Sequence, residues 1–451
     1  MQAIIISNGL SSRMWPYNLD NKCVLSIGFK SIIKRLVLQL NYHKVEKIHL
    51  ILDQSVDLVK SQLKEFDNIN YVIAQENQLK KVLLSLKDED DDFIVLFGDL
   101  SISDYDFSKL IHLFQSKGDC LLVKKSCDEY QVCDHMAVVV DNDKVKKVYG
   151  HPRNHYAALI SLGMFGLSKY AFGKIDEVNY GFEEIVAGGM PDNGFYLETL
   201  INNLVKEQDV YYHVCEHKSF NIDTPIDLLR ANHSYCMTTV NEIKNNHYGN
   251  NLIISDSAII KGNMICGDNV IVGDNVVIKG NVVIGNNVTI ENGVIMGHNC
   301  MINEGSTIRN YAIISDNTII GKDCKIENNA DICGMIFDKA SIVHHSEIYG
   351  IIGRAVDVGA GVLCGSLRFD DQNNSIKIQD KRYKGSFTNA TFVGDYSRIG
   401  VGVIFNPGQR VGNYSCVGGG VVVSSDIESN KIVSVKQDLI FNDWGSKKYN
   451  W

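Results

Sequence analysis

The sequence has little of what marks a secreted, membrane-bound or nucleic-acid-binding protein. It contains five prolines, and its twelve cysteines form no C-x-x-C pair that would suggest disulfides or zinc. The apolar run at residues 3–6 is only four residues long and has no basic flank, which argues against a signal peptide or a membrane span there. The net charge of −9 gives no reason to expect nucleic acid or an anionic membrane as a partner. We therefore expect a cytoplasmic globular protein.

The second half of the chain is organised by a six-residue repeat. From Ser255 to Ile332 the sequence forms thirteen such units, each ending in a large apolar residue, with a mostly small or β-branched residue two positions earlier. Neither a 3.6-residue helix nor a hairpin strand keeps this period. A parallel β-helix does, because each unit can form one flat wall with Gly, Asn or Asp at the corner. A rigid prism is therefore expected behind a separate first domain.

The chain begins with a strand and a loop of small residues. Residues 3–6 (AIII) are typical of a buried parallel strand, and residues 7–16 (SNGLSSRMWP) follow at once. Small residues between a strand and a positive charge indicate a loop whose backbone amides close around phosphate, with Arg13 as a fixed cation. An ordinary strand-to-helix turn is the alternative that this segment alone leaves open.

A second strand end supplies a carboxylate. Strand-like and helix-like segments alternate to about residue 120, which predicts an α/β domain with a mainly parallel sheet. Residues 93–97 (FIVLF) form an apolar strand that ends in Gly98 and Asp99. Ligands bind beyond the carboxyl ends of such strands, so Asp99 and the loop after Ile6 should share a crevice. A divalent cation would explain an acid opposite a phosphate loop, whereas a turn-capping aspartate is the alternative.

Three ordered segments resemble the sugar-phosphate nucleotidylyltransferases. They are residues 9–16 (GLSSRMWP) with Lys22, residues 95–99 (VLFGD), and residues 221–228 (NIDTPIDL). With the repeat behind them, their order is similar to that of bifunctional enzymes that join a nucleotidylyltransferase to a left-handed β-helix acyltransferase. The likeness covers nearly the whole chain. It implies an α/β, Rossmann-like nucleotidyltransferase domain followed by a left-handed parallel β-helix.

The expected domain plan has four parts. A nucleotidyltransferase-like domain spans residues 1–232, and residues 233–250 form a linker helix, because Met237, Val240 and Ile243 have helical spacing. The β-helix spans 251–432 with an inserted loop at 365–392, and the tail 433–451 is expected to lie back on the prism. The class also implies a homotrimer about the prism axis.

The resemblance implies in-line attack by a sugar-1-phosphate oxygen on the α-phosphorus of a nucleoside triphosphate, with release of pyrophosphate. Arg13 would bind the departing pyrophosphate, and Lys22 the α-phosphate or the sugar phosphate. Mg²⁺ would be held by Asp99 and by either Asn221 or Asp223, between which the sequence does not decide. The expected substrate-binding residues of the loop and the neighbouring strand end are Asn8, Gly9, Leu10, Ser11, Ser12 and Gly98.

Several positions depart from the family pattern. Ser11 replaces the second glycine of the loop, and Gln75 heads a base-side segment that has lost its Gly-Thr-Ala. His151 stands in the place of the sugar-side lysine. Gln75 and His151 are still the expected substrate contacts at these two places. The sequence therefore predicts the phosphate and metal parts of the site, whereas it names neither the nucleotide nor the sugar.

The repeat is interrupted between Ile332 and Val393. Two four-residue slips precede the excursion at 365–392, whose cationic surplus suits a phosphate or the pyrophosphate of coenzyme A, or simply forms a solvated basic loop. Residues 359–370 (GAGVLCGSLRFD) resemble the acetyltransferase half of the bifunctional enzymes and place Arg368 among the substrate contacts. There, His344 or His345 would take a proton from a sugar amine that attacks acetyl-CoA. Surface histidines at a coil corner are the alternative.

Three functions compete on the sequence alone. The leading hypothesis is a sugar-1-phosphate nucleotidylyltransferase whose β-helix adds an acyltransferase activity. The second is an acyltransferase with an inactive front domain, and the third is a scaffold that binds a nucleotide-sugar without chemistry. Arg13, Lys22 and Asp99 together argue against the third, because a binding protein has little use for a metal carboxylate aimed at a phosphate loop.

Overall fold

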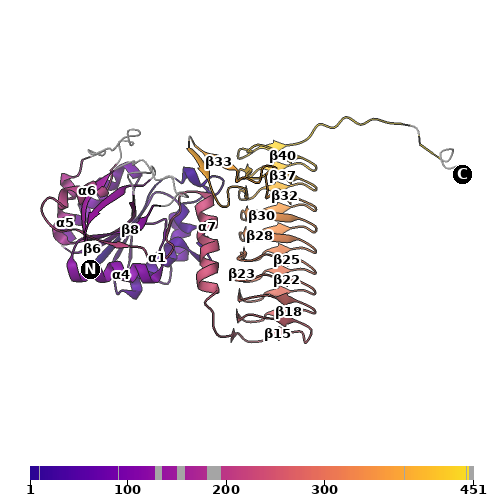
Figure 1. The fold of residues 1–451 in the computed structure, drawn as a ribbon, viewed down its shortest axis with the longest axis horizontal. Helices are drawn as coiled ribbons and strands as arrows, with labels where there is room; N and C mark the ends of the chain where they lie inside the picture. The colour runs from indigo at the N-terminus through magenta and orange to yellow at the C-terminus, as the bar shows by residue number, and fades with distance from the viewer. Residues whose placement is uncertain are drawn as a thin grey trace.

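The computed structural model shows a sheet-and-helix domain beside a β-helix, with the C-terminal tail extending away from both (Figure 1). The expected fold class, an α/β domain followed by a left-handed parallel β-helix, is confirmed. The structure describes the whole chain except residues 10, 90, 127–134, 150–157, 180–194, 380, 443 and 446–451.

The first domain is built on a nine-stranded sheet in the order β5-β4-β1-β6-β11-β8-β12-β10-β9. Strands β5, β4, β1 and β6 are parallel neighbours, and β12 is parallel to β8, whereas β9, β10 and β11 add antiparallel pairings. The strands are β1 (Gln2–Ser7), β4 (Ile48–Leu52), β5 (Ile69–Ile73), β6 (Phe93–Phe97), β8 (Cys120–Lys125), β9 (Ala137–Asp141), β10 (Lys144–Tyr149), β11 (Leu159–Leu167) and β12 (Tyr211–Val214).

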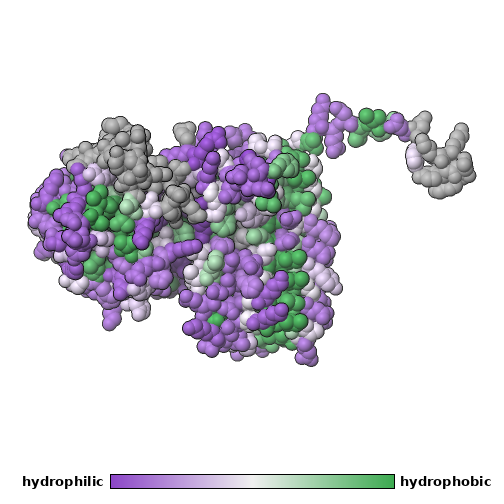
Figure 2. Space-filling view, in the orientation of Figure 1, coloured by the Kyte–Doolittle hydropathy of each residue, from purple (hydrophilic) through white to green (hydrophobic). Residues whose placement is uncertain are grey.

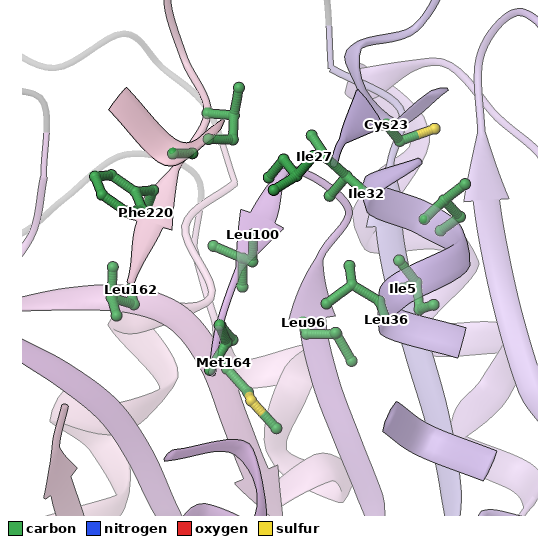
Figure 3. Close-up of a cluster of buried hydrophobic side chains, with 14 of the residues drawn as sticks. Ile5, Cys23, Ile27, Ile32, Leu36, Leu96, Leu100, Leu162, Met164 and Phe220 are labelled. Carbon is green, nitrogen blue, oxygen red and sulfur yellow. The ribbon is translucent and has the colours of Figure 1, made fainter. Parts of the chain in front are cut away.

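Helices cover both faces of this sheet, which is why β1 can be apolar throughout. Ala3 and Ile5 face a core shared with the first helix, while Ile4 and Ile6 face the opposite core. Figure 3 shows the first of these clusters, where Ile5, Leu96 and Met164 of the sheet meet Ile32 and Leu36. The helices are α1 (Ile32–Tyr42), α2 (Val56–Gln62), α3 (Leu79–Leu86), α4 (Asp104–Lys117), α5 (Lys169–Gly173), α6 (Glu198–Leu204) and α7 (Pro225–Tyr235).

A short two-stranded arm crosses the end of the sheet. Strands β7 (Leu100–Ser101) and β13 (Phe220–Asn221) pair in antiparallel register, with Asn221 opposite Leu100. The Leu100 and Phe220 side chains point into the core of Figure 3. The arm therefore fixes the segment after β6 against the segment that precedes α7.

The helix at the join lies earlier in the chain than expected. The predicted bounds 233–250 are wrong: α7 starts at Pro225 and continues as a π-helix, η8 (Cys236–Val240), so only residues 233–240 of the predicted span are helical. Thr224 caps its start, with Pro225 in the first turn, which is a strong initiation signal. The Asn281 side chain of the β-helix donates to the carbonyls of Val240, Asn241 and Ile243 at 3.0–3.1 Å. These bonds satisfy the orphan carbonyls and so favour an end at this point.

The repeat forms three parallel walls whose strands pair 18 residues apart, as Ile253 does with Ile271. Three six-residue units therefore make one coil. The first wall contains β15 (Ile253–Ile254), β18 (Ile271–Val272), β21 (Thr289–Ile290), β24 (Thr307–Ile308), β27 (Lys325–Ile326), β29 (Ser341–Ile342), β31 (Asp357–Val358), β36 (Arg398–Ile399), β39 (Cys416–Val417) and β41 (Ile432–Val433).

The other two walls share two long strands, β28 (Asp331–Ile336) and β30 (Glu347–Ile352). The wall that faces α7 and η8 contains β14 (His247–Tyr248), β17 (Met264–Cys266), β20 (Val282–Ile284), β23 (Cys300–Ile302), β26 (Ile319–Ile320), β35 (Thr391–Val393) and β38 (Arg410–Val411). The third wall contains β16 (Ile259–Ile260), β19 (Val277–Ile278), β22 (Ile295–Met296), β25 (Ile313–Ile314), β32 (Leu363–Cys364), β37 (Ile404–Phe405) and β40 (Val422–Val423).

At each of the two four-residue slips, the chain passes from one wall of the β-helix to the next without a turn. Strands β28 and β30 run straight from one wall into the next, and their partners lie 16 residues apart, as Asp331 and Glu347 do. The corner residues are Gly334 (φ +123°) and Gly350 (φ +141°), a backbone conformation that favours glycine. A Cβ on Gly350 would lie 1.9 Å from the Thr391 carbonyl oxygen. The slips therefore depend on glycine at these two corners.

The excursion at 365–392 is not a simple loop. It contains a hairpin of β33 (Ser375–Ile378) and β34 (Lys381–Lys384) that projects toward the first domain (Figure 1).

The expectation that the tail lies back on the prism is wrong for the described part. There Leu439, Ile440 and Phe441 are 71–88% exposed. None of the described helices, the longest of which is the 14-residue α4, could cross a membrane.

Candidate active site

The phosphate loop and Asp99 leave the sheet at the same edge. Strands β1 and β6 are parallel neighbours, with Ile6 opposite Phe97, so residues 7–13 and Gly98-Asp99 emerge side by side. The Gly98 amide donates to the Ile6 carbonyl at 2.8 Å. A Cβ on Gly98 would lie 2.6 Å from the Ser7 side chain, so this close approach requires glycine. The two strand ends that the sequence predicts to share one site therefore lie side by side.

A polar network holds the start of the loop. The Asn21 amide donates to the Ser7 carbonyl at 2.5 Å and to Asp53 at 3.0 Å, and its oxygen accepts from the Ser7 hydroxyl at 3.0 Å. The Lys22 backbone amide donates to the Ser11 hydroxyl at 3.1 Å. Ser11 thus does more than replace a glycine, because it ties the loop to the segment that carries Lys22.

Of the remaining predicted loop residues, Asn8 is buried, whereas Gly9 and Ser12 border open space. The Asn8 side-chain amide donates to the Gln75 carbonyl at 3.1 Å, which brings the expected base-side segment next to the loop. A Cβ on Gly9 would meet nothing within 4 Å, and Ser12 is exposed at the start of the 3₁₀ helix η1 (Ser12–Met14). Leu10 and His151 lie outside the described residues, so their predicted contacts remain predictions.

Two cations and two carboxylates meet beside these strand ends. The Lys22 ammonium contacts both Asp99 and Asp223, with 2.8 Å between its Nζ and Asp223 Oδ1. Arg13 contacts the same Asp223 oxygen at 2.8 Å. Lys22, Asp99 and Asp223 are largely buried, so their charges interact with little screening by solvent. Lys22 and Asp223, which lie 201 positions apart in the chain, are therefore joined directly.

The electrostatics of the four groups are asymmetric. Burial alone would raise the pKa of Asp223, but Lys22 and Arg13 hold that pKa well below its usual range. Asp99 contacts only one cation, and burial raises the pKa of its carboxyl. Burial would also lower the pKa of Lys22, which the two carboxylates instead raise. Of the two acids, Asp99 is thus the one whose charge these cations compensate less.

Two buried oxygens fit a divalent cation. Within the described part of the chain, Asp99 Oδ1 and Asn221 Oδ1 are buried and have no hydrogen-bond partner. The two residues are close because the Ile222 amide donates to the Asp99 carbonyl at 2.9 Å. Carboxylate and amide oxygens are the ligands that Mg²⁺ prefers. Unsatisfied buried oxygens are costly, and a cation would satisfy both. Asp223, by contrast, already binds two cationic side chains.

Two further residues border the ion cluster and were missed by the sequence reasoning. Lys124 lies buried at the end of β8, with its ammonium 3.5 Å from the Ser219 carbonyl. His135 is half-buried, and burial together with Lys124 lowers its pKa to about 4, while Asp223 acts in the opposite sense. Its ring is therefore neutral near pH 7. No spacing marks either residue, because a lysine at a strand end and a single histidine are ordinary features.

Glu198 in α6 is a buried carboxyl whose burial raises its pKa to about 7. Because the unfolded value is 4.5, the folded state keeps a proton that the unfolded state releases between these two pH values. Stability should therefore fall as the pH rises through this window. We expect the free energy of unfolding of Glu198→Gln to exceed that of the wild type by roughly 2–3 kcal/mol at pH 8, and to be nearly equal to it at pH 4.5. Urea unfolding at the two pH values measures this difference. Glu207→Gln, an exposed carboxyl, should show no such gain.

The predicted residues of the β-helix site lie on its surface. His344 and His345 are exposed at one coil corner, with their rings in edge-to-face contact at 5.4 Å. Arg368 is exposed and forms an ion pair with Asp370 at 2.9 Å. Its Nη1 also donates to Asn374 at 3.3 Å. The roles assigned to these three residues stay predictions.

Comparisons with known proteins follow the same division of the chain. The family model described as the GMPPB C-terminal domain matches residues 248–366. Over 449 residues the chain is 26% identical to "Bifunctional protein GlmU" of Methanocaldococcus jannaschii, covering 98% of this chain and 99% of that protein.

Two further matches cover parts of the chain. "Bifunctional sugar-1-phosphate nucleotidylyltransferase/acetyltransferase" of Sulfurisphaera tokodaii is 30% identical over 95 residues, 21% of this chain and 24% of that protein. The solved UDP-glucose pyrophosphorylase of Acinetobacter baumannii is 16% identical, with a TM-score of 0.41, and covers 52% of this chain and 93% of its own. In motif order and along nearly its whole length, the chain thus resembles bifunctional sugar-1-phosphate nucleotidylyltransferase/acetyltransferases, with a nucleotidylyltransferase domain followed by a left-handed β-helix.

Proposed function

We propose that the chain is a nucleotidylyltransferase that forms a nucleotide-sugar from a nucleoside triphosphate and a sugar-1-phosphate. One observation carries this proposal: Lys22 joins Asp99 and Asp223 beside two buried, unsatisfied oxygens, at the mouth of a loop of small residues. Such a cluster matches a reaction in which the protein positions phosphates and neutralises their charge. A scaffold that only binds nucleotide-sugar would not need it.

The residues take distinct roles in this reaction. The amides of residues 8–12 bind the triphosphate, and Arg13 binds the pyrophosphate that leaves. Lys22 binds the α-phosphate or the sugar phosphate when substrate arrives, because its ammonium can donate to phosphate oxygens as well as to the carboxylates. Asp99 and Asn221 would hold Mg²⁺, which when bound neutralises charge on the phosphates. Asp223 keeps Lys22 and Arg13 in place until substrate arrives.

The test is pyrophosphate release. The protein is incubated with Mg²⁺, each common nucleoside triphosphate and a panel of sugar-1-phosphates, and pyrophosphate is measured with and without the sugar. We expect release that requires one sugar phosphate and one nucleotide. Release with none of the combinations would contradict the proposal.

The ten described cysteines are free thiols, which suits the cytoplasm, where these substrates are made.

The β-helix carries the second proposed activity, transfer of an acetyl group from acetyl-CoA to a sugar amine. The similarity to bifunctional relatives over 98% of the chain supports it, as do the exposed pair His344-His345 and Arg368. One of the two histidines would take the proton from the amine as the amine attacks the thioester. Free thiol should appear when the protein is mixed with acetyl-CoA and the right amino-sugar phosphate. If no acceptor releases free thiol from acetyl-CoA, the β-helix would serve only as a scaffold.

We also propose that the third wall of the β-helix forms the interface of a homotrimer. Its outward-facing residues make one continuous ladder, and hydrophobic residues also gather in a band along the β-helix in Figure 2. Ile259, Ile313, Leu363, Ile404 and Val422 of this ladder are 39–56% exposed. The ladder is apolar except at Asp331 and Glu347, and two exposed apolar runs of this kind are unusual on a monomer. The residues of the ladder are Ile259, Val277, Ile295, Ile313, Asp331, Glu347, Leu363, Ile404 and Val422.

The trimer gives a direct prediction. Ile404→Lys places a charge in the centre of the apolar end of the ladder, where it would be buried without a partner in the assembly. We expect the wild type to sediment as a trimer and the variant as a monomer. Lys325→Ala, on the first wall, should leave the sedimentation coefficient unchanged. A wild-type monomer at micromolar concentration would contradict the proposed interface.

A further inference from the structure

The hairpin β33–β34 reaches the phosphate loop from the β-helix. At its tip, the Gln379 side-chain amide donates to the Ser12 hydroxyl at 3.0 Å. Ser12 is the last of the loop residues assigned to the triphosphate and directly precedes Arg13. A side chain 367 positions away in the sequence therefore fixes the end of the phosphate loop.

The hairpin is packed onto the first domain by its apolar side. Ile376 and Ile378 are buried in the same hydrophobic core as Ile5 and Leu96 of the sheet. Side chains alternate along a strand, so Lys377 between them points outward and is exposed. Tyr383 lies opposite Ile376 in the hairpin and is half-buried against the same core. The position of the tip is thus set by buried packing, not by the single contact of Gln379.

The segment that follows the loop is clamped by the β-helix as well. The Trp15 indole donates to the Ser429 hydroxyl at 3.2 Å, and the Arg410 guanidinium lies over the Trp15 ring at 4.7 Å. Arg410 also donates to the Lys377 carbonyl of the hairpin at 2.6 Å. One arginine therefore joins the hairpin to the residue that follows the phosphate loop.

Further contacts continue along the same segment. The Tyr17 hydroxyl donates to the Ile351 carbonyl at 2.6 Å, and Asp20 forms an ion pair with Arg354 at 2.7 Å. Tyr17 and Asp20, like Trp15, belong to the stretch between the loop and Lys22. The stretch that carries Arg13 and leads to Lys22 is consequently held between the sheet on one side and the β-helix on the other.

We propose that the hairpin β33–β34 is a part of the nucleotidyl-transfer site, in which Gln379 acts as a positioning residue through Ser12. The inference rests on the proposed function and deepens it, because it makes binding of the nucleoside triphosphate by the first domain depend on the β-helix. Tyr383 of the same hairpin is one of the groups that raise the pKa of Arg13. A loop held in its bound shape loses less entropy when the phosphates arrive.

The test compares Gln379→Ala with Gln372→Ala. Gln372 is the matched control, because it lies in the same excursion with an exposed side chain. We expect Gln379→Ala to raise the KM for the nucleoside triphosphate about fivefold, the ratio that one lost hydrogen bond between side chains gives, and to leave kcat within about twofold. Gln372→Ala should match the wild type. In a Ser12→Ala background the effect of Gln379→Ala should vanish, because the contact is already lost.

A second measurement does not depend on turnover. The Met14 and Trp15 amides donate to the carbonyls of Ser11 and Ser12, so they report the order of the loop. Their hydrogen exchange should be faster in Gln379→Ala than in the wild type and Gln372→Ala. Equal exchange in all three proteins, or an equal rise in KM with and without the Ser12 hydroxyl, would overturn the role of the hairpin. Absence of pyrophosphate release by the wild type would contradict the proposed function alone, since the exchange experiment would still decide the inference.

Discussion

Asp99→Ala is expected to reduce pyrophosphate release by about a hundredfold to a thousandfold, the range seen when one group that stabilises transition-state charge is removed. The carboxylate has two tasks, since Oδ2 contacts Lys22 and Oδ1 is one of the two buried oxygens suited to Mg²⁺. Alanine removes both. Initial rates with the best substrate pair, at several Mg²⁺ concentrations, measure the loss.

The fold of this variant should survive. Lys22 keeps its contact with Asp223, and burial disfavours the Asp99 charge, so its removal costs little stability. Circular dichroism and a urea midpoint close to the wild type would show this. Asp143→Ala, which removes an exposed acid paired with Lys117, is the control and should keep full activity. Full turnover by Asp99→Ala would show that the metal assignment is wrong.

The structure narrows a choice that the sequence left open. Asn221 Oδ1 is buried and unsatisfied among the described residues, whereas Asp223 Oδ1 accepts from both Arg13 and Lys22. We therefore favour Asn221 as the second metal ligand and Asp223 as the acid that places the two cations. The two roles differ in the measurement that reveals them. Loss of the Asn221 oxygen should raise the Mg²⁺ requirement, while loss of Asp223 should weaken phosphate binding at any Mg²⁺ concentration.

The parts of the fold that repeat or lie close in sequence were predictable. A strict six-residue period permits one architecture, because each unit must bury its last residue and turn at the next corner. The positions of the carboxyl ends of β1 and β6 were equally predictable from the sequence. Each is marked by a local signal, which is an apolar run that ends in a small-residue loop or in an acid. The contact of Lys22 with both acids was not predicted, because Asp223 lies far along the chain and the resemblance implied a phosphate partner for Lys22.

The parts that depend on packing between distant segments were not predictable. The sequence predicts the linker helix too far along the chain, because the helical spacing of Met237, Val240 and Ile243 is visible in it. The Asn281 side chain that caps the end of the helix comes from another domain, so no local pattern marks that end. The sequence predicts that the basic excursion either binds a phosphate or forms a solvated loop, because its charges are the feature that the sequence shows. Its two isoleucines, which pack onto the first domain, carry no distinguishing pattern. Lys124 and His135 were missed for the same reason.

Gly350→Ala is expected to destabilise the β-helix by about 3–5 kcal/mol, among the largest effects of a single substitution. A Cβ there would lie 1.9 Å from the Thr391 carbonyl oxygen and 2.7 Å from the Thr391 amide, which are backbone atoms that cannot move aside. Gly361→Ala is the control, since Gly361 also has positive φ (+66°) but open space around it, and should cost only about 1–2 kcal/mol. Urea midpoints of the two variants test the difference. Because β30 also supplies Ile351, to which Tyr17 is bonded, the loss should extend to the segment that carries Arg13 and Lys22. Equal midpoints would show that the straight corner tolerates a side chain and that the slips have another cause.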